Sequence, residues 1–407
     1  MKIKVAVLFG GKTTEHEISI ISAIQAMGCI NGDKYQVIPV YISKDNDMYV
    51  GENIGNIEKY KNIPALIKES KKVTFVSEGN KVNIMYVSSK GFSKKVYDTV
   101  DVAFPIVHGT NAEDGTLFGY LKMFNLPIVG CDVTSSAVGM DKYVAKTVLK
   151  YNDIPVLDCL RVYSWDYNDD NEKMMDNIEA KVSYPMIVKP VNLGSSVGIS
   201  KAKDRDGLAT SLELAFKFAD KVIVERAITN LKEINCSVLG DEIHAEASEC
   251  EEPVSHGDIL DYKDKYMGGN GKNGTKGGAK SAGGSKGMAS LARKIPADIS
   301  DDVRAYIREM AVKAFKVLGC NGVSRIDFMI DKDTNEVFLN EINTIPGSLS
   351  FYLWEPMGVP YHELLDRMIM LALKRNTREE NLIFSFETNV LEGVKLGGST
   401  GAKGSKM

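Results

Sequence analysis

Four polar side chains interrupt two apolar segments near the C-terminal end of the chain, residues 323–330 and 336–347. They are Arg325, Asp327, Glu341 and Asn343. A polar break of five residues, 331–335, lies between the segments, so the pattern predicts a β-hairpin. If residue 330 pairs with residue 336, Arg325 lies opposite Glu341 and all four polar groups share one face. A turn one residue longer or shorter would separate them.

The polar face of this hairpin offers ligands for a divalent cation. Two carboxylates and an amide supply oxygen atoms, which Mg²⁺ prefers together with substrate phosphates, and a neighbouring guanidinium suits a developing oxyanion. A surface hairpin with a cross-strand ion pair is the alternative. Acid and amide groups in an apolar strand are costly to bury without a partner, which favours the cation site. The opposite face is expected to pack on a core through Ile326, Phe328, Ile330, Phe338 and Ile342.

A glycine pair follows the first apolar segment, residues 5–9. Thr14 and Glu17 then fit a capping box for a helix over 18–29. Glu15 is either a first-turn acid favoured by the helix dipole or a ligand for an ammonium group. The spacing G-x-G-x-x-G of nicotinamide-binding turns is absent.

Two further strands lead into polar turns. Residues 100–107 lead into His108, at the strand end where ligands of open α/β sheets bind, although a lone histidine is more often structural. Residues 185–190 carry Lys189 and precede the small-residue loop 192–198. Such a loop lets backbone N–H groups approach phosphate oxygens closely, but Gly-Ser loops are also common turns.

Residues 221–228 form another predicted strand, which contains Glu225 and is followed by Glu233. It is either a plain core strand or one wall of an adenine slot. The remaining predicted elements are strands over 35–42 and 126–130, a helix over 141–151, a helix capped by Ser300 and ended by Gly319, and a helix over 361–374.

Composition favours a globular enzyme. The 407 residues suffice for two or three lobes, and the 44% hydrophobic and 26% charged contents are ordinary. A net charge of -4 and a pI near 5.9 argue against a nucleic-acid partner. Six cysteines without C-x-x-C spacing indicate free thiols in a reducing compartment and no zinc site. Because no apolar stretch is long enough to span a bilayer, we expect no membrane partner and a cytoplasmic location.

A stretch rich in glycine and lysine changes the character of the chain between residues 260 and 296. Its low apolar content predicts either a disordered insertion or a lid that orders over substrate. The last residues, from about 396, are similarly rich in glycine and predict a mobile tail.

Taken together, these motifs resemble the D-alanine:D-alanine ligase family of the ATP-grasp superfamily, over roughly residues 3–373. All of them occur in the family's order. The matching motifs are Gly10-Gly-x-Thr-Thr-Glu15-His-Glu-x-Ser19, His108-Gly-x-x-x-Glu-Asp-Gly, Met140-Asp-Lys142, Lys189-Pro, Gly194-Ser195-Ser-Val-Gly, Asp261-Tyr-x-x-Lys265-Tyr266, Arg325-Ile-Asp327 and Asn340-Glu341-x-Asn343-Thr-x-Pro-Gly347.

The resemblance implies an α/β protein with the ATP-grasp fold. Its parts would be an N-terminal parallel-sheet α/β domain that binds substrate and two α+β lobes that clasp ATP. The implied boundaries are 1–137 for the first domain, 138–231 for the small lobe, 232–375 for the C-terminal lobe with the metal site and the lid loop 260–296, and 376–407 for a flexible tail. A cytoplasmic homodimer is also a family expectation.

The implied reaction joins two D-alanine molecules through an acyl phosphate, for peptidoglycan precursor synthesis, with ATP and two Mg²⁺ ions, or Mn²⁺ in their place. The implied metal ligands are Asp327, Glu341 and Asn343. The implied nucleotide contacts are Lys142, Lys189, Glu225, Ile228 and Glu233. The implied catalytic groups are Glu15, Ser195, Tyr266, Arg325 and Gly347. The implied substrate contacts are His108, Lys265, Tyr352 and Leu353.

Three departures from the family matter. Ala227 stands where an aromatic residue is common, the lid carries a glycine-lysine insertion over 268–286, and Tyr352 replaces a serine that contacts the second substrate. Alternatives therefore stay open: ligation to D-serine, D-lactate or another amine, or nucleotide binding without catalysis. The two metal carboxylates and Arg325 argue against the last, and we expect D-alanine to be preferred over D-serine and D-lactate.

Overall fold

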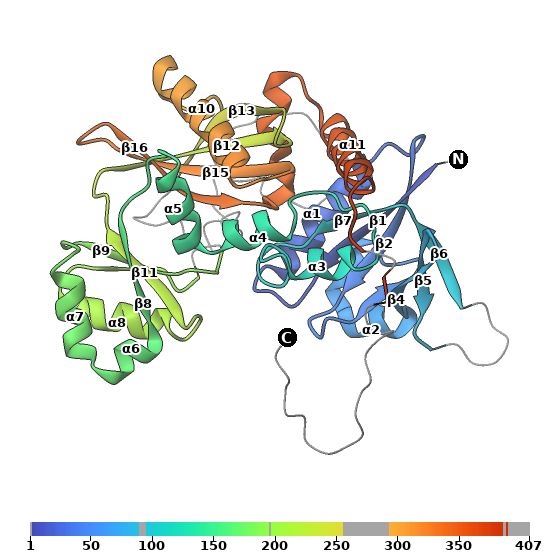
Figure 1. Cartoon of the computed structure of the whole chain (residues 1–407), viewed down its shortest axis with the longest axis horizontal. Helices are drawn as coiled ribbons and strands as arrows, with labels where there is room; N and C mark the ends of the chain where they lie inside the picture. The colour runs from blue at the N-terminus through green and yellow to red at the C-terminus, as the bar shows by residue number, and fades with distance from the viewer. Residues whose placement is uncertain (1, 89–94, 195–196, 255–292, 386–387, 390–407) are drawn as a thin grey trace.

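Three β-sheets carry the fold (Figure 1). The computed structural model describes residues 2–88, 95–194, 197–254, 293–385 and 388–389. Within this part of the chain, no helix is long and apolar enough to cross a membrane.

The first sheet has seven strands in the order β6-β5-β4-β3-β2-β1-β7. Strand β1 pairs in parallel with β2 and β7, as predicted, whereas the strands from β2 to β6 pair antiparallel. The strands are β1 (Ile3–Gly10), β2 (Tyr35–Ile42), β3 (Met48–Val50), β4 (Lys71–Glu78), β5 (Lys81–Tyr86), β6 (Val96–Val100) and β7 (Val102–Ile106). The helices are α1 (His16–Cys29), η1 (Ile57–Asn62), α2 (Ile63–Glu69) and α3 (Thr116–Lys122).

Two local predictions for this sheet are wrong. A capping box with Thr14 as N-cap requires a helix that begins at residue 15. Helix α1 instead begins at His16, and its N-cap is Glu15, which makes no side-chain capping hydrogen bond. The Glu17 carboxylate binds Lys44 instead, at 2.8 Å. Residues 126–130 form no strand, because Ile128 makes only an isolated parallel bridge to Ala103.

The second sheet is antiparallel, in the order β10-β9-β11-β8. Its core is apolar and contains residues of all four strands and of α7 and α8. The elements are α4 (Val133–Met140), α5 (Lys142–Tyr151), β8 (Cys159–Tyr163), α6 (Ser164–Asp169), α7 (Asn171–Glu179), β9 (Met186–Pro190), β10 (Ser200–Ala202), α8 (Arg205–Ala215) and β11 (Lys221–Arg226).

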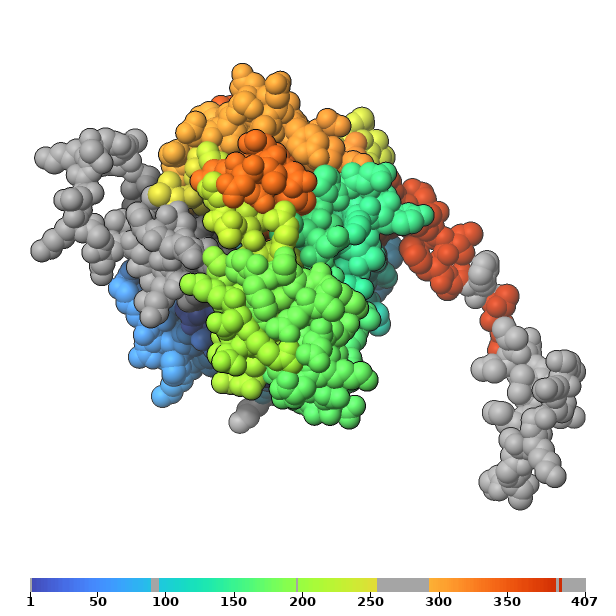
Figure 2. Space-filling view, turned by 90° about the vertical axis from the view of Figure 1, so that its left-hand side faces the viewer, coloured from blue at the N-terminus to red at the C-terminus, as the bar shows by residue number. Residues whose placement is uncertain are grey.

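The third sheet, in the order β14-β13-β12-β15-β16, lies above the second sheet in both views (Figures 1 and 2). Helix α10 covers one face of this sheet with the predicted apolar side chains, and Gly319 follows its end with φ +66°. The elements are β12 (Leu231–Gly240), β13 (Ala245–Pro253), β14 (Arg293–Lys294), α10 (Asp301–Val317), β15 (Gly322–Asp331) and β16 (Glu336–Asn343).

The predicted hairpin is β15–β16, but its register differs from the prediction. Next to the turn, residue 330 pairs with residue 337. A bulge at Asn340 then shifts the ladder, so Asp327 pairs with Glu341 and Arg325 with Asn343. Because Asp331 pairs with Glu336, the turn is one residue shorter than predicted. The bulge compensates for this difference, so the four polar residues share one face. Phe338 pairs with Met329 on the site side of the sheet, so its predicted core position is wrong.

The last helix, α11 (Tyr361–Glu379), extends five residues beyond the predicted end. Together with η3 (Gly347–Leu353) it packs against the first sheet and belongs to the same hydrophobic core. Between them lies η4 (Glu355–Met357).

Candidate active site

One cavity is lined by residues of the second and third sheets and of the segments that follow β1 and β7 of the first sheet. The structure brings together eleven of the sequence-predicted site residues in its wall: Glu15, His108, Lys189, Glu225, Ile228, Glu233, Arg325, Asp327, Glu341, Asn343 and Gly347. Ser195, Lys265, Tyr266 and most of the loop 260–296 lie outside the described residues.

A buried cluster of two lysines and one carboxylate marks the end of the cavity on the second sheet. Strands β9 and β11 place Lys189 beside Glu225, and helix α5 brings Lys146 to the same carboxylate, with Nζ 2.5 Å from Oε2. Lys189 also donates to Asn340 Oδ1 at 3.1 Å. Burial raises the pKa of Glu225, but the two lysines outweigh this effect and hold it at about 2. Sequence reasoning missed Lys146, whose position four residues after Lys142 puts both on one helix face.

Next to this cluster is an apolar surface. Leu157, Ile228 and Met329 form a small buried group, and Phe338 packs against it. Ala227 lines the cavity beside Ile228. A flat apolar ring of adenine size fits such a surface better than a charged group does.

Lys142 does not line the cavity but contacts its wall from the start of helix α5. Its ammonium donates to the carbonyl oxygen of Leu193 at 2.7 Å and lies 3.2 Å from Glu341 Oε2. The lysine therefore joins the small-residue loop after β9 to a predicted metal ligand.

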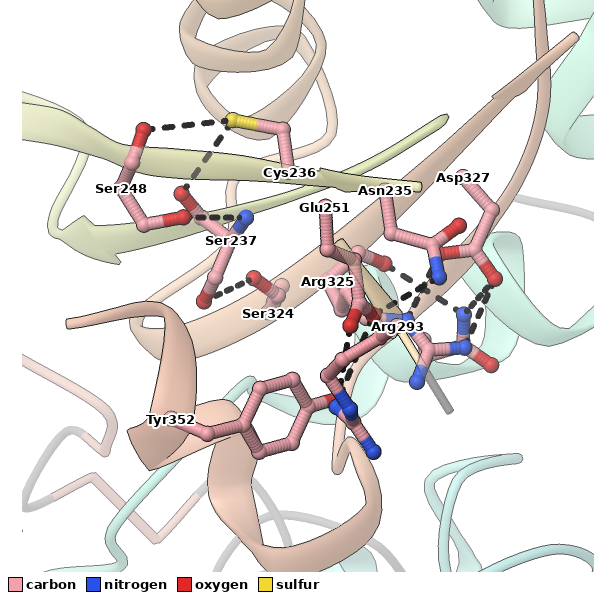
Figure 3. Close-up of polar contacts among 11 residues, drawn as sticks. Asn235, Cys236, Ser237, Ser248, Glu251, Arg293, Ser324, Arg325, Asp327 and Tyr352 are labelled. Atoms are coloured by element: carbon pink, nitrogen blue, oxygen red, sulfur yellow. Dashed lines mark hydrogen bonds and ion pairs between the residues drawn. The ribbon is translucent and has the colours of Figure 1, made fainter. Parts of the chain in front are cut away.

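The metal-ligand candidates lie on the paired strands β15 and β16. Asp327 lies directly opposite Glu341, and the Asn343 amide donates to Asp327 Oδ2 at 3.0 Å. Arg325 donates to both oxygens of Asp327, through Nε and Nη2 at 2.7 Å each (Figure 3). Burial lowers the pKa of Arg325, but Asp327 outweighs burial and raises it well above the ordinary value.

This donor set fits Mg²⁺ bound together with phosphates. Two carboxylates and one amide supply hard oxygen ligands, fewer than a cation needs without substrate oxygens. The described part of the chain holds no cluster of three or more His, Cys, Asp or Glu that could bind a metal. The contacts of Arg325 and Lys142 with these carboxylates show that the site already favours cations.

The opposite end of the cavity lies at the start of helix α1. Glu15 is buried there, and a Cβ on Gly194 would lie 3.0 Å from its Oε2, so the loop after β9 approaches the Glu15 carboxylate closely. His108 is also buried, with Nδ1 2.7 Å from the Ile345 carbonyl oxygen and Nε2 2.8 Å from Ser22 Oγ. Burial lowers the pKa of His108 and favours the neutral ring.

Glu113 is a site residue to which sequence reasoning gave no role. Its carboxyl accepts the N–H groups of Gly109 at 2.8 Å and Ile345 at 3.0 Å. It thereby ties the turn after β7 to the segment that leads into Gly347. Burial, assisted by Glu15, raises the pKa of Glu113 to about 8. Its place in the His-Gly-x-x-x-Glu motif is the feature that could have revealed it.

A second cluster lines the cavity at strand β13 (Figure 3). Glu251 accepts from Asn235 Nδ2 at 2.9 Å and from Arg293 Nη1 at 2.9 Å. The Arg293 guanidinium lies 3.8 Å from the centroid of the Tyr352 ring, and the Tyr352 hydroxyl lies 3.4 Å from Glu251. Tyr352 thus stands behind the cavity wall, and Leu353 is fully buried in the core of the first sheet.

Comparisons with known proteins agree with these observations. Two family models match the chain, "D-ala D-ala ligase N-terminus" over residues 4–131 and "D-ala D-ala ligase C-terminus" over residues 148–370. The chain is 38% identical to the D-alanine--D-alanine ligase of Thermosipho melanesiensis, over 97% of this chain and 99% of that protein. It is also 38% identical to the D-alanine--D-alanine ligase of Caldicellulosiruptor bescii, over 95% and 99%.

Two solved structures are similar throughout. The D-alanine-D-alanine ligase of Coxiella burnetii superposes with a TM-score of 0.75 at 30% identity, covering 93% of this chain and 96% of that one. The VanG D-Ala:D-Ser ligase of Enterococcus faecalis gives a TM-score of 0.73 at 31% identity, covering 91% and 100%.

Proposed function

The chain belongs to the D-alanine–D-alanine ligase family, and we propose that it joins two D-alanine molecules to D-alanyl-D-alanine at the expense of ATP. The fold is accordingly ATP-grasp, and the family's role is in cell-wall precursor synthesis. One observation carries the proposal: a single cavity places a lysine-carboxylate cluster, oxygen ligands for a cation, and the buried acid of helix α1 side by side.

The first step is phosphoryl transfer to the carboxylate of the first D-alanine. We assign its ammonium to Glu15, the adenosine to Glu225, Ile228 and Glu233, and the phosphates to Lys142 and Lys189. A carboxylate oxygen attacks the γ-phosphorus, the bond to the β-phosphate oxygen breaks, and ADP leaves. Because little covalent chemistry falls to the protein, positioning and charge neutralisation drive this step.

The second step is attack of the amine of the second D-alanine on the acyl carbon. A tetrahedral carbon forms, its oxygen becomes negative, and the bond to phosphate then breaks as the amine loses a proton. Arg325 and the N–H group of Gly347 would stabilise that oxyanion, which both can approach because both line the cavity. We propose that Ser195 and Tyr266 orient Glu15 and that His108 and Lys265 contact substrate.

Asp327, Glu341 and Asn343 would hold two Mg²⁺ ions, with Mn²⁺ as a substitute. When bound, such ions neutralise phosphate charge. The residues themselves keep three oxygen-bearing groups on one sheet face, and Lys189 of the second sheet donates to Asn340 of the same strand as Glu341 and Asn343.

Incubation with ATP, Mg²⁺ and D-alanine tests the proposed function. We expect D-alanine-dependent phosphate release and equal formation of dipeptide, identified by its mass. Absence of D-alanine-dependent phosphate release would contradict the proposal.

For the second substrate we propose D-alanine over D-serine and D-lactate. Competition among the three at equal concentration, scored by product mass, tests this preference. The solved structure named as a D-Ala:D-Ser ligase makes D-serine the alternative. Mainly mixed dipeptide or depsipeptide would contradict the preference.

We further propose a cytoplasmic homodimer divided as the sequence suggests, at 1–137, 138–231, 232–375 and 376–407. The three separate sheets support this division. A light-scattering mass near 44.7 kDa, the mass of one chain, would exclude the dimer.

A further inference from the structure

We propose that Arg293 binds the α-carboxylate of the second amino acid and is held in position for this task by Glu251 and Tyr352. This inference rests on the proposed ligase function and deepens it, because it assigns the group that recognises the acceptor. It also changes the expected role of Tyr352, from a substrate contact to a support for Arg293.

A row of polar residues crosses the third sheet and ends at Arg293. Glu341 pairs with Asp327, Asp327 with Asn235, and Asn235 with Glu251, each directly opposite the next on neighbouring strands. Directly paired residues point to the same face of a sheet, so the row faces the cavity as a unit. Neighbouring strands lie about 4.8 Å apart, which places Glu251 roughly 10 Å from Asp327. Arg293 extends from the far end of this row.

That spacing suits an acceptor amino acid. The proposed cation ligands and Arg325 lie at the near end of the row, where the acyl group reacts, and Arg293 lies at the far end. An amino acid whose amine points to the acyl carbon directs its carboxylate away from it. The far end of the row is therefore where a second D-alanine needs a cation.

The chemistry of Arg293 fits a carboxylate. A guanidinium is permanently charged and offers N–H donors in a planar fork that matches a carboxylate. The Tyr352 ring at 3.8 Å fixes the plane of the guanidinium, and Glu251 at 2.9 Å fixes one edge. Only 11% of the Arg293 side chain is exposed, so its charge acts in a partly desolvated setting. Such preorganisation lowers the cost of ordering a binding group.

Arg325 is the other guanidinium that lines the cavity near this row, at its near end. Arg325 donates two hydrogen bonds to Asp327 and is the group that we propose to stabilise the oxyanion. The two arginines therefore have separate roles: Arg325 stabilises the developing oxyanion, and Arg293 binds the permanent charge of the acceptor carboxylate.

The test compares Arg293→Met, which keeps the stem and removes the charge, with Arg293→Lys. Initial rates over a wide range of D-alanine concentration separate the donor and acceptor Michaelis constants. We expect the acceptor KM to rise about 100-fold in Arg293→Met, the usual scale for a lost charge-assisted pair, and less in Arg293→Lys. The KM for ATP should change less than about twofold in both.

D-alaninamide provides a readout that a structural role of Arg293 would not move. It keeps the amine and the methyl group but carries no negative carboxylate, and without a carboxyl group it cannot serve as donor. The wild-type enzyme should prefer D-alanine to D-alaninamide as acceptor, and Arg293→Met should lose most of this preference. Product masses distinguish the two dipeptides.

Arg304→Met is the matched control. Arg304 makes a similar ion pair with strand β13, to Glu249 at 2.6 Å, but does not line the cavity. It should leave the acceptor KM and the D-alaninamide preference unchanged.

The outcomes separate this inference from the proposed function. No dipeptide from the wild-type chain contradicts the ligase function itself. Dipeptide formed by Arg293→Met with an unchanged acceptor KM, or with acceptor and ATP constants raised in parallel, overturns the role of Arg293 alone. If Arg293→Met does not fold, the preference of Arg293→Lys between D-alanine and D-alaninamide decides: a preference equal to that of the wild-type enzyme overturns the inference.

Discussion

Glu225→Gln should destabilise the free protein strongly, because Glu225 is the carboxylate between two buried lysines. The carboxylate is almost completely buried, and it contacts the ammonium groups of Lys146, which is 3% exposed, and Lys189, which is 7% exposed. Glutamine keeps the size of the side chain but removes the negative charge. Two ammonium groups then face each other across a neutral amide.

The structure sets the scale of this effect. A pKa of about 2 instead of 4.5 means that the folded protein favours the Glu225 carboxylate over the neutral acid by about 3 kcal/mol. Removing one partner from a buried ion pair commonly costs about 3–5 kcal/mol. We therefore expect Glu225→Gln to lower the free energy of unfolding by about 3 kcal/mol at neutral pH. Because the folded-state pKa of Glu225 lies below the unfolded value, this contribution is present above about pH 4.5 and disappears as the pH falls toward 2.

Urea unfolding without nucleotide measures the effect, and a second substitution tests its cause. If the loss comes from uncompensated lysines, adding Lys146→Met to Glu225→Gln should recover about 1–2 kcal/mol, since one buried charge is removed. Glu246→Gln is the control, because Glu246 forms an exposed ion pair with Arg367 at 2.9 Å and should cost less than about 1 kcal/mol. A loss below about 1 kcal/mol for Glu225→Gln, or a double variant less stable than the single one, would refute the reasoning.

Three further predictions follow from other parts of the chain. Glu341→Gln removes one charge from the proposed cation ligands, so turnover should fall at least about 100-fold while ATP affinity falls less than about tenfold; near-normal turnover in a steady-state assay excludes the ligand role. Asp241→Asn should lower the free energy of unfolding by about 1–3 kcal/mol at pH 7, because Asp241 accepts two backbone N–H groups and the Lys374 ammonium. Burial raises the pKa of Asp241 but these hydrogen bonds hold it at about 2, so the loss should shrink in unfolding curves below about pH 4, and a loss that does not depend on pH contradicts the assignment. Gly10→Ala should lower the free energy of unfolding by more than about 1 kcal/mol, because Gly10 has φ +95° and an added Cβ would lie 2.3 Å from a carbonyl oxygen of β2. Gly28→Ala is the control, because Gly28 has open space around it in helix α1, and it should be neutral or stabilising. Equal urea midpoints for the two variants would contradict the prediction for Gly10.

The sequence predicts the composition of the β15–β16 face but not its register. Apolar and polar residues alternate clearly enough to assign Arg325, Asp327, Glu341 and Asn343 to one side. The residue type of Asn340 does not mark it as a bulge. The bulge adds one unpaired residue to β16, so residues 336–339 face the opposite side of the sheet from the side that strict alternation with Glu341 and Asn343 predicts. Phe338 was assigned to the wrong face for this reason.

The second cluster could not be predicted because its members come from distant segments. Glu251 reaches the row of Asp327 only through the intervening strand β12, and Arg293 reaches Glu251 only when β14 pairs with β13. Neither strand pairing is marked by a pattern in the local sequence. Lys146 and Glu113 differ, because Glu113 stands in the His108-Gly-x-x-x-Glu motif and Lys146 lies in the helix predicted over 141–151. Only a loop or helical geometry is needed to assign them to the site.

The packing of helix α11 against the first sheet has a consequence for synthesis on the ribosome. The core of that sheet is shared with Leu364, Leu365, Met368, Ile369 and Ala372 of the helix. Roughly 250 residues separate the end of β7 from the start of α11. At a synthesis rate of about 5–20 residues per second, helix α11 is made some 10–50 s after the first sheet, and until then the apolar face that it covers stays exposed. The first part of the chain to emerge is therefore among the last to complete its core, and a nascent chain arrested before residue 361 should expose this apolar face to chaperones.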